Sequence, residues 1–230
     1  MLVAANVRRR RIDMKQDSNN IRRSCIDCAA GACDGKSGTY PDFCLTCELL
    51  SEEDNPLIAE TLDKYTSDPE DSLIAKASAT VEYEHYCKAT RVEEICAFAE
   101  KIGAKKLGVA TCVGLLKEAR AAAAIFRRRG FDVVGITCKA GAVRKTDIGL
   151  DPEQEDLGPH ICNPILQAEY LNKEKTDLNI VIGLCVGHDS LFYKYSDALC
   201  TTLVTKDRVL GHNPVAALYQ TDSYYSRLLK

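Results

Sequence analysis

The spacing of hydrophobic residues changes along the chain. Between Asn55 and Ile102, apolar side chains recur three or four positions apart, which is the spacing of one face of an α-helix. From Lys106 onward, short β-rich runs alternate with helical stretches. These runs are KLGVAT at 106–111, FDVVGIT at 131–137, LNIVIGL at 178–184 and ALCTTLVTK at 198–206. The pattern therefore predicts helices first and strands joined by helices after them.

Proline and glycine mark the ends of the predicted helices. Asn55-Pro56 combines a capping residue with a proline at the first helical position, and Ser67 or Asp68 before Pro69 repeats the device. Gly103 is expected to end the last helix of this segment. The later helices are predicted at GLLKEARAAAAIFRRR (114–129), ILQAEYLNKE (165–174), HDSLFYKYS (188–196) and HNPVAALYQ (212–220).

This alternation predicts an α/β fold with a mostly parallel sheet flanked by helices, preceded by a small N-terminal cysteine-rich metal-binding module. Strands that are apolar on both faces are typical of such a sheet. We expect three parts. Residues 1–23 form a disordered basic leader, residues 24–50 form the cysteine-rich metal module, and residues 51–230 form a helical segment plus the α/β domain.

Composition narrows the class of protein. The 230 residues are 46% hydrophobic and 27% charged, and no apolar run approaches the roughly 18 residues of a membrane span. A net charge of -3 gives no strong nucleic-acid signal. There are twelve cysteines but no tryptophan. The N-terminus lacks the charged-then-apolar order of a secretory signal, so we expect a cytoplasmic protein whose thiols stay free for metals.

Four cysteines lie where the predicted topology gathers loops at one edge. Cys112, Cys138 and Cys185 each follow a predicted strand, and Cys162 precedes the Asn163-Pro164 helix start. Because the carboxyl ends of parallel strands share an edge at which ligands bind, we expect the four thiols to converge there and bind an iron–sulfur cluster. The alternative is that each cysteine is a small core side chain.

Side chains suited to catalysis lie near these cysteines in the sequence. His188 and Asp189 follow Cys185, and His212 follows the fourth strand, so all three are candidate catalytic residues. Ordinary loop and capping roles are the alternative. The long segment after Cys138 carries Lys139, Arg144 and Lys145 and is a candidate lid for an anionic small-molecule substrate, although its many acidic residues favour solvated surface for most of it.

The front segment has the spacing of a metal module. It contains the five candidate metal ligands Cys25, Cys28, Cys33, Cys44 and Cys47. Two CxxC pairs can close a tetrahedron, so structural zinc is one interpretation, an iron–sulfur site with a choice of ligands is another, and metal-free thiols are a third. Cys87, Cys96 and Cys200 are interpreted as packing residues.

Several of these motifs carry a family resemblance. CIDCAAGAC and YPDFC at the front, and CKAG, CNPILQAEYLN, TDLNIVIGLCVGHDSLF and TTLVTKDRVLGHNP behind, resemble the cysteine-rich family catalogued as domain of unknown function eighteen forty-seven, over about residues 24 to 220. The family is commonly labelled metal-binding and has no established reaction. The resemblance implies that Cys25, Cys28, Cys33 and Cys44 belong to its front motif, whereas Cys47 is an addition in this sequence.

Together these observations predict an iron–sulfur protein of anaerobic metabolism that acts as a redox or sulfur-transfer enzyme on a small substrate. A non-catalytic zinc-binding or metal-handling protein is the first alternative. A metal-free thiol redox carrier is the second.

Overall fold

The structure is a computed structural model that describes residues 23–35, 38–51 and 56–230. It divides into two compact units, residues 1–72 and residues 73–230. The predicted basic leader lies outside the described residues, except for Arg23. In the described part of the chain, no helix is long and apolar enough to cross a membrane.

The first unit contains the cysteine-rich segment. Short 3-10 helices cover Cys25–Asp27 and Ala32–Asp34, followed by α1 (Leu45–Ser51) and α2 (Pro56–Ser67). Among its described side chains only Ala32 is buried. Hydrophobic burial therefore contributes little to the order of this segment.

The boundary between the units falls inside α3 (Pro69–His85). Asp68 caps this helix, because its Oδ1 accepts hydrogen bonds from the amides of Glu70 and Asp71. Ala77 and Val81 are the buried residues of α3, and both belong to the second unit.

The second unit is the predicted α/β domain, and its sheet is entirely parallel. The strands are β1 (Lys106–Thr111), β2 (Asp132–Thr137), β3 (Leu178–Ile182) and β4 (Leu199–Val204), in the order β2-β1-β3-β4. The chain moves from β1 outward to β2 and then returns to the other side of β1. The carboxyl ends of β1 and β3 therefore flank the point at which the strand order reverses, which is where α/β sheets bind ligands.

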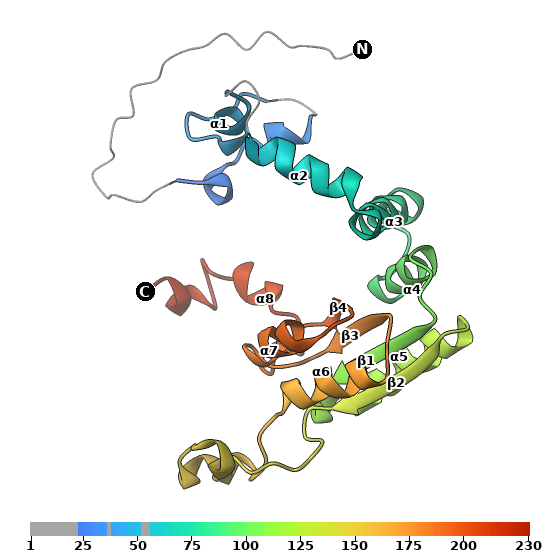
Figure 1. Cartoon of the computed structure of the whole chain (residues 1–230). Helices are drawn as coiled ribbons and strands as arrows, with labels where there is room; N and C mark the ends of the chain where they lie inside the picture. The colour runs from blue at the N-terminus through green and yellow to red at the C-terminus, as the bar shows by residue number, and fades with distance from the viewer. Residues whose placement is uncertain (1–22, 36–37, 52–55) are drawn as a thin grey trace. The chain divides into compact units, whose positions relative to one another are not determined.

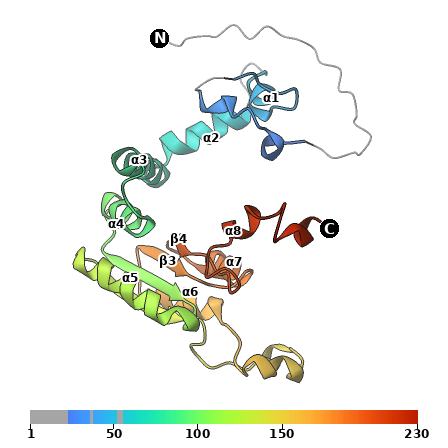
Figure 2. The same ribbon diagram turned by 180° about the vertical axis from the view of Figure 1, so that it is seen from behind.

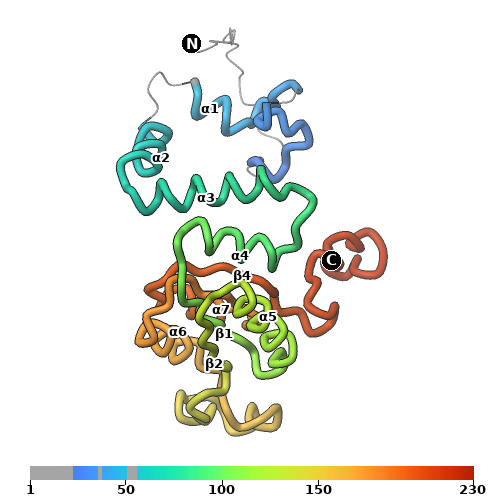
Figure 3. Tube along the Cα trace, turned by 90° about the vertical axis from the view of Figure 1, so that its right-hand side faces the viewer, coloured from blue at the N-terminus to red at the C-terminus, as the bar shows by residue number. Residues whose placement is uncertain are grey.

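Helices cover both faces of this sheet. They are α4 (Arg91–Lys101), α5 (Leu116–Arg128), α6 (Pro164–Lys173) and α7 (His188–Tyr195). Helix α8 (Val215–Leu218) follows β4 in the chain and has no buried residue. Helix α5 packs on β1 and β2 from one face and α6 packs on them from the opposite face, as Figures 1 and 2 show from the two sides and Figure 3 shows from a third direction. Helix α7 contacts α6, and α4 contacts β4.

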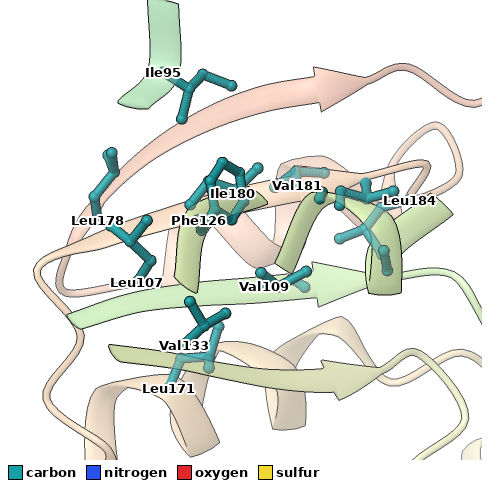
Figure 4. Packing of buried hydrophobic residues seen from close by; sticks show 14 of the residues in the cluster. Ile95, Leu107, Val109, Phe126, Val133, Leu171, Leu178, Ile180, Val181 and Leu184 are labelled. Atoms are coloured by element: carbon teal, nitrogen blue, oxygen red, sulfur yellow. The ribbon is translucent and has the colours of Figure 1, made fainter. Parts of the chain in front are cut away.

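The hydrophobic core lies between the sheet and these helices (Figure 4). All five residues of β3 are buried, as expected for a strand covered on both faces. Phe126 of α5 and Leu171 of α6 have no exposed surface. Cys96 packs in this core as predicted, but Cys87 does not, because it is exposed and lies beyond the end of α3 with a φ of 55°.

Candidate thiolate site at the sheet edge

Main-chain hydrogen bonds extend the sheet beyond the strand ends and position the cysteines that follow. The Cys112 amide donates to the Ile182 carbonyl over 3.0 Å, and the Cys138 amide donates to the Thr111 carbonyl over 2.8 Å. The segment 139–161 loops out from the sheet (Figure 1). It returns where the Asn163 amide donates to the Cys138 carbonyl over 2.7 Å, which brings Cys162 to the same edge.

Of the four predicted thiols, Cys138 interacts with two of the others. The Cys138 thiol forms side-chain hydrogen bonds with both Cys112 and Cys162. The amide of Val113 also donates to the Cys138 sulfur over 3.4 Å. Cys112 and Cys138 are buried, and Cys162 is partly buried. The structure thus places Cys138 in the middle of a row of three sulfur atoms.

These contacts favour thiolates at the two ends of the row. The hydrogen bond with Cys138 is the main cause that lowers the pKa of Cys112 to about 4, against the opposing effect of burial, with help from the Gly114 amide and Lys206. The hydrogen bond with Cys138 also lowers the pKa of Cys162 to about 5. Cys138 itself keeps its proton, because its hydrogen bonds with both neighbours and its burial raise its pKa.

Three cations surround the sulfur atoms. Lys206 hydrogen-bonds to Cys112, and Lys139 hydrogen-bonds to Cys162. The Arg208 Nη2 atom donates to the Cys185 sulfur over 3.0 Å. No ion pair in the described part of the chain joins Lys139, Lys206 or Arg208 to a carboxylate. The positive charges of Lys206 and Lys139 therefore favour the thiolate forms of Cys112 and Cys162.

Arg208 links Cys185 to two of the other cysteines, Cys112 and Cys162. Its pKa is raised mainly by the hydrogen bond and the charge of Cys185, with smaller contributions from Cys112 and Cys162. Sequence analysis missed Lys206 and Arg208. Their positions in the sequence could have identified them, because both follow the carboxyl end of β4, just as Cys112, Cys138 and Cys185 follow β1, β2 and β3.

The three predicted catalytic residues have different surroundings. The charge of His188 lowers the pKa of Cys162, while Asp189 uses Oδ1 to accept from the Ser190 amide over 2.8 Å. The described hydrogen bonds of His212 are both with Asp207, whose amide donates to its Nδ1 over 3.1 Å. Of the three, His188 is the one that the structure connects to the thiols.

The basic residues of the predicted lid interact mostly with groups of the same segment. Arg144 pairs with Glu155, and Lys145 donates to the carbonyl of Gln154. Lys139 donates to the carbonyl of His160 in addition to its hydrogen bond with Cys162. Lys139 is therefore the basic residue of this segment that acts on a thiol.

Among the five front cysteines, Cys44 and Cys47 interact with each other. Cys44 directly precedes α1, and the Cys47 amide is the main cause that lowers its pKa. Burial and the hydrogen bond with Cys44 raise the pKa of Cys47. Cys25 and Cys33 are exposed and Cys28 is partly buried.

The donor chemistry at the sheet edge fits a metal, although the side chains do not converge on one point. Across residues 23–35, 38–51 and 56–230, no three His, Cys, Asp or Glu side chains are placed to hold a single ion. Thiolates are nevertheless the ligands that soft metals and iron–sulfur clusters select. A [4Fe–4S] cluster also binds each thiolate to a separate iron, so its ligands need not meet at one atom.

Comparison with known proteins places this site inside a family. The model of "Protein of unknown function (DUF1847)" matches residues 48–203. An uncharacterized protein of Methanocaldococcus jannaschii, MJ0455, is 44% identical over 161 residues, which are 70% of this chain and 82% of that protein. No solved structure matches significantly. The family match is shorter than the range 24 to 220 expected from the motifs. It includes the four sheet-edge cysteines and excludes the five front cysteines.

Proposed function

This chain belongs to the DUF1847 family, and from the chemistry of its thiolate site we propose that it is a metal-binding protein with an iron–sulfur cluster at the carboxyl edge of the sheet. Cys112, Cys138 and Cys162 would hold the cluster, and Cys185 is the further thiol of the site. The single observation that carries the proposal is the row of three sulfur atoms, two of which favour the thiolate form.

The surrounding charges support an anionic centre. Lys139, Lys206 and Arg208 bring three positive charges to the thiols and have no carboxylate partners in the described part of the chain. Such cations destabilise one another unless negative charge lies between them. Thiolates that ligate a cluster supply that negative charge.

The position of the site favours an enzyme of redox or sulfur-transfer type acting on a small substrate. A bound cluster would supply electron transfer or an open iron that acts as a Lewis acid. His188, Asp189 and His212 would orient the substrate or hold a proton near it. The front segment would form a second metal site, with zinc as the simplest occupant. A reducing cytoplasm would keep all these thiols free.

Metal analysis of the full chain tests the proposal. We expect protein purified without oxygen to contain iron and acid-labile sulfide, and Cys138→Ser to lose most of both. Cys87→Ser is the matched control, because Cys87 is exposed and has no part in the site. The paired change of Cys44 and Cys47 to serine should leave the sulfide content intact. Zinc alone in the wild type, or full iron in Cys138→Ser, would overturn the proposal.

A metal-free thiol redox carrier is the second candidate, favoured by the contacts of Cys138 with two thiolates. In this reaction the Cys112 thiolate attacks a disulfide of a partner protein and releases one partner sulfur as a thiolate. Cys138, after losing its proton, then attacks the Cys112 sulfur and releases the second partner thiolate. One disulfide is thereby exchanged for another. Wild-type protein without iron or sulfide that forms the Cys112–Cys138 disulfide would establish this alternative.

A further inference from the structure

Arg208 is an exposed cation in direct contact with Cys185. Its Nη2 atom donates to the Cys185 sulfur over 3.0 Å. A guanidinium carries five N–H donors. Among the described residues, the Arg208 side chain makes no other hydrogen bond and no ion pair with a carboxylate. The remaining donors are therefore available to a group that a bound molecule brings to the site.

The sheet places the loops that carry Cys185 and Arg208 side by side. Hydrogen bonding between β3 and β4 continues past the end of β3, because the Gly183 amide donates to the Val204 carbonyl over 2.7 Å. The Cys185 carbonyl accepts from the amides of the first two residues of α7 over 2.9 and 3.1 Å. These bonds hold the main chain of Cys185 at the sheet edge, where the chain after β4 brings Arg208 to its sulfur.

His212 closes the loop that carries Arg208. The Asp207 amide donates to the His212 Nδ1 atom over 3.1 Å, and the His212 amide donates to the Asp207 carbonyl over 2.8 Å. Within the loop, the Asp207 Oδ1 atom accepts from the amides of Val209 and Leu210 over 2.9 and 2.8 Å, as in an Asx turn. Together these hydrogen bonds hold the backbone on both sides of Arg208.

His212 has a backbone conformation that is uncommon for a residue with a side chain. Its φ is 67°, in the left-handed region that favours glycine. Such residues persist where the surrounding contacts require them, and they cluster at functional sites. The contact at stake here is the hydrogen bond from the Asp207 amide, which a glycine could not accept. His212 therefore acts on the site through the loop that it closes.

Resting on the proposed activity toward a small substrate, we infer that Arg208 binds an anionic group of that substrate, such as a carboxylate, beside the Cys185 sulfur, and that His212 is the positioning residue that holds Arg208 there. The sequence suggested Arg144 and Lys145 for an anionic substrate, but both interact within their own segment. A guanidinium matches the planar carboxylate and can bind it through two parallel hydrogen bonds. Binding of this kind orients the substrate toward the thiols.

Two alkylating reagents of similar size test the role of Arg208 in the full-length reduced protein. Iodoacetate carries a carboxylate and iodoacetamide a neutral amide, so the ratio of their rates at one thiol reports anion binding beside it, whatever the thiolate fraction. Arg208→Gln should lower the ratio at Cys185 by about threefold or more, as expected for a lost exposed ion pair. The ratio at exposed Cys87, read in the same peptide digest, should not change. Arg120→Gln removes the same charge from the exposed surface of α5 and should leave the ratio at Cys185 unchanged.

Three variants of His212 separate its hydrogen bond from its backbone conformation. His212→Ala should lower the ratio at Cys185 as Arg208→Gln does. His212→Gly suits the left-handed backbone but lacks the acceptor, so it should lower the ratio too. His212→Asn keeps an acceptor on a residue that tolerates this backbone, and should retain most of the ratio. An unchanged ratio in both the alanine and the glycine variants would overturn the positioning role.

The outcomes distinguish this inference from the proposed function, because alkylation of Cys185 requires no metal. An unchanged ratio in Arg208→Gln would overturn anion binding by Arg208, and iron and sulfide in the same protein would leave the proposed cluster standing. Protein without iron and sulfide whose ratio still depends on Arg208 would overturn the cluster. Arg208 would then be the anion-binding residue of a metal-free thiol site.

Discussion

The main-chain amide of Asn163 donates a hydrogen bond of 2.7 Å to the carbonyl oxygen of Cys138. This bond joins the residue that precedes α6 to the residue that follows β2, so the long connection between them starts and ends at the sheet edge. Because Cys162 is covalently bonded to Asn163, the same contact positions the third thiol of the site.

The Asn163 side chain should stabilise this arrangement measurably. Its Oδ1 atom accepts from the Leu166 amide over 2.9 Å and so caps α6. Asn163→Ala should lower the free energy of unfolding by about 1 kcal/mol, as expected for a lost N-cap. Asn163→Asp keeps the acceptor and should cost much less. Urea unfolding measures both, and equal stability of the alanine variant and wild type would contradict the capping role.

Cys138 should control the ionisation of both neighbouring thiols. Since its hydrogen bond is the main cause of the low pKa values of Cys112 (about 4) and Cys162 (about 5), Cys138→Ala should raise both. The rate of alkylation of each thiol as a function of pH, read by peptide mass spectrometry, measures this. Unchanged pKa values in the variant would remove Cys138 from this role.

The same two pKa values predict how stability varies with pH in metal-free, reduced protein. The unfolded thiols bind protons below about pH 8.5, whereas folded Cys112 and Cys162 stay ionised down to about 4 and 5. The stability that these two thiolates contribute to the folded state is therefore complete above the pKa of the unfolded thiols. It is lost as the pH falls through the pKa values of the folded protein. Between these limits, the stability of wild type should increase with pH more steeply than that of Cys138→Ala. Parallel stability curves would contradict the prediction.

Lys206 and Lys139 should act on different thiols. Lys206 hydrogen-bonds to Cys112 and Lys139 to Cys162, so Lys206→Gln should raise the pKa of Cys112 and Lys139→Gln that of Cys162. Each variant serves as the control for the other in the alkylation experiment. An equal effect of either substitution on both thiols would show that the lysines contribute only a general positive field.

Gly108 of β1 should not tolerate a side chain. A Cβ atom there would lie 2.0 Å from the Asn179 Oδ1 atom and 2.9 Å from a methyl group of Leu171. The Asn179 side chain cannot move freely, because it is fully buried and both of its polar atoms are hydrogen-bonded. Its Oδ1 atom accepts from the Thr176 hydroxyl and its Nδ2 atom donates to the Ser196 hydroxyl. Gly108→Ala should therefore destabilise the protein by roughly 2 kcal/mol or more.

Gly135 of β2 provides the matched control. It is paired with Val109 in the adjacent strand, and a Cβ atom there would meet its nearest neighbour at 3.5 Å, an ordinary contact. Gly135→Ala should change the free energy of unfolding by less than about 0.5 kcal/mol. If both alanine variants unfolded at the same denaturant concentration, close packing around Gly108 would not be the cause.

The order of the elements follows from the sequence because hydrophobic periodicity is a local property. KLGVAT is the whole of β1, and the other three predicted strands contain β2, β3 and β4 with only their ends differing. The positions of Cys112, Cys138 and Cys185 after these strands are local as well. Cys87 was misjudged, since the end of α3 at His85 depends on backbone geometry beyond the helical pattern.

What the tertiary structure alone decided is which strand ends become neighbours. The pairing of β3 with β1 brings the loops carrying Cys112 and Cys185 to one edge, and the Asn163–Cys138 bond brings Cys162 to it. The chain after β4 returns Lys206 and Arg208 to the thiols, and α7 leaves the His188 nitrogen buried without a partner. These contacts join residues far apart in the chain, so they depend on strand order and loop return, which a local hydrophobic pattern does not encode.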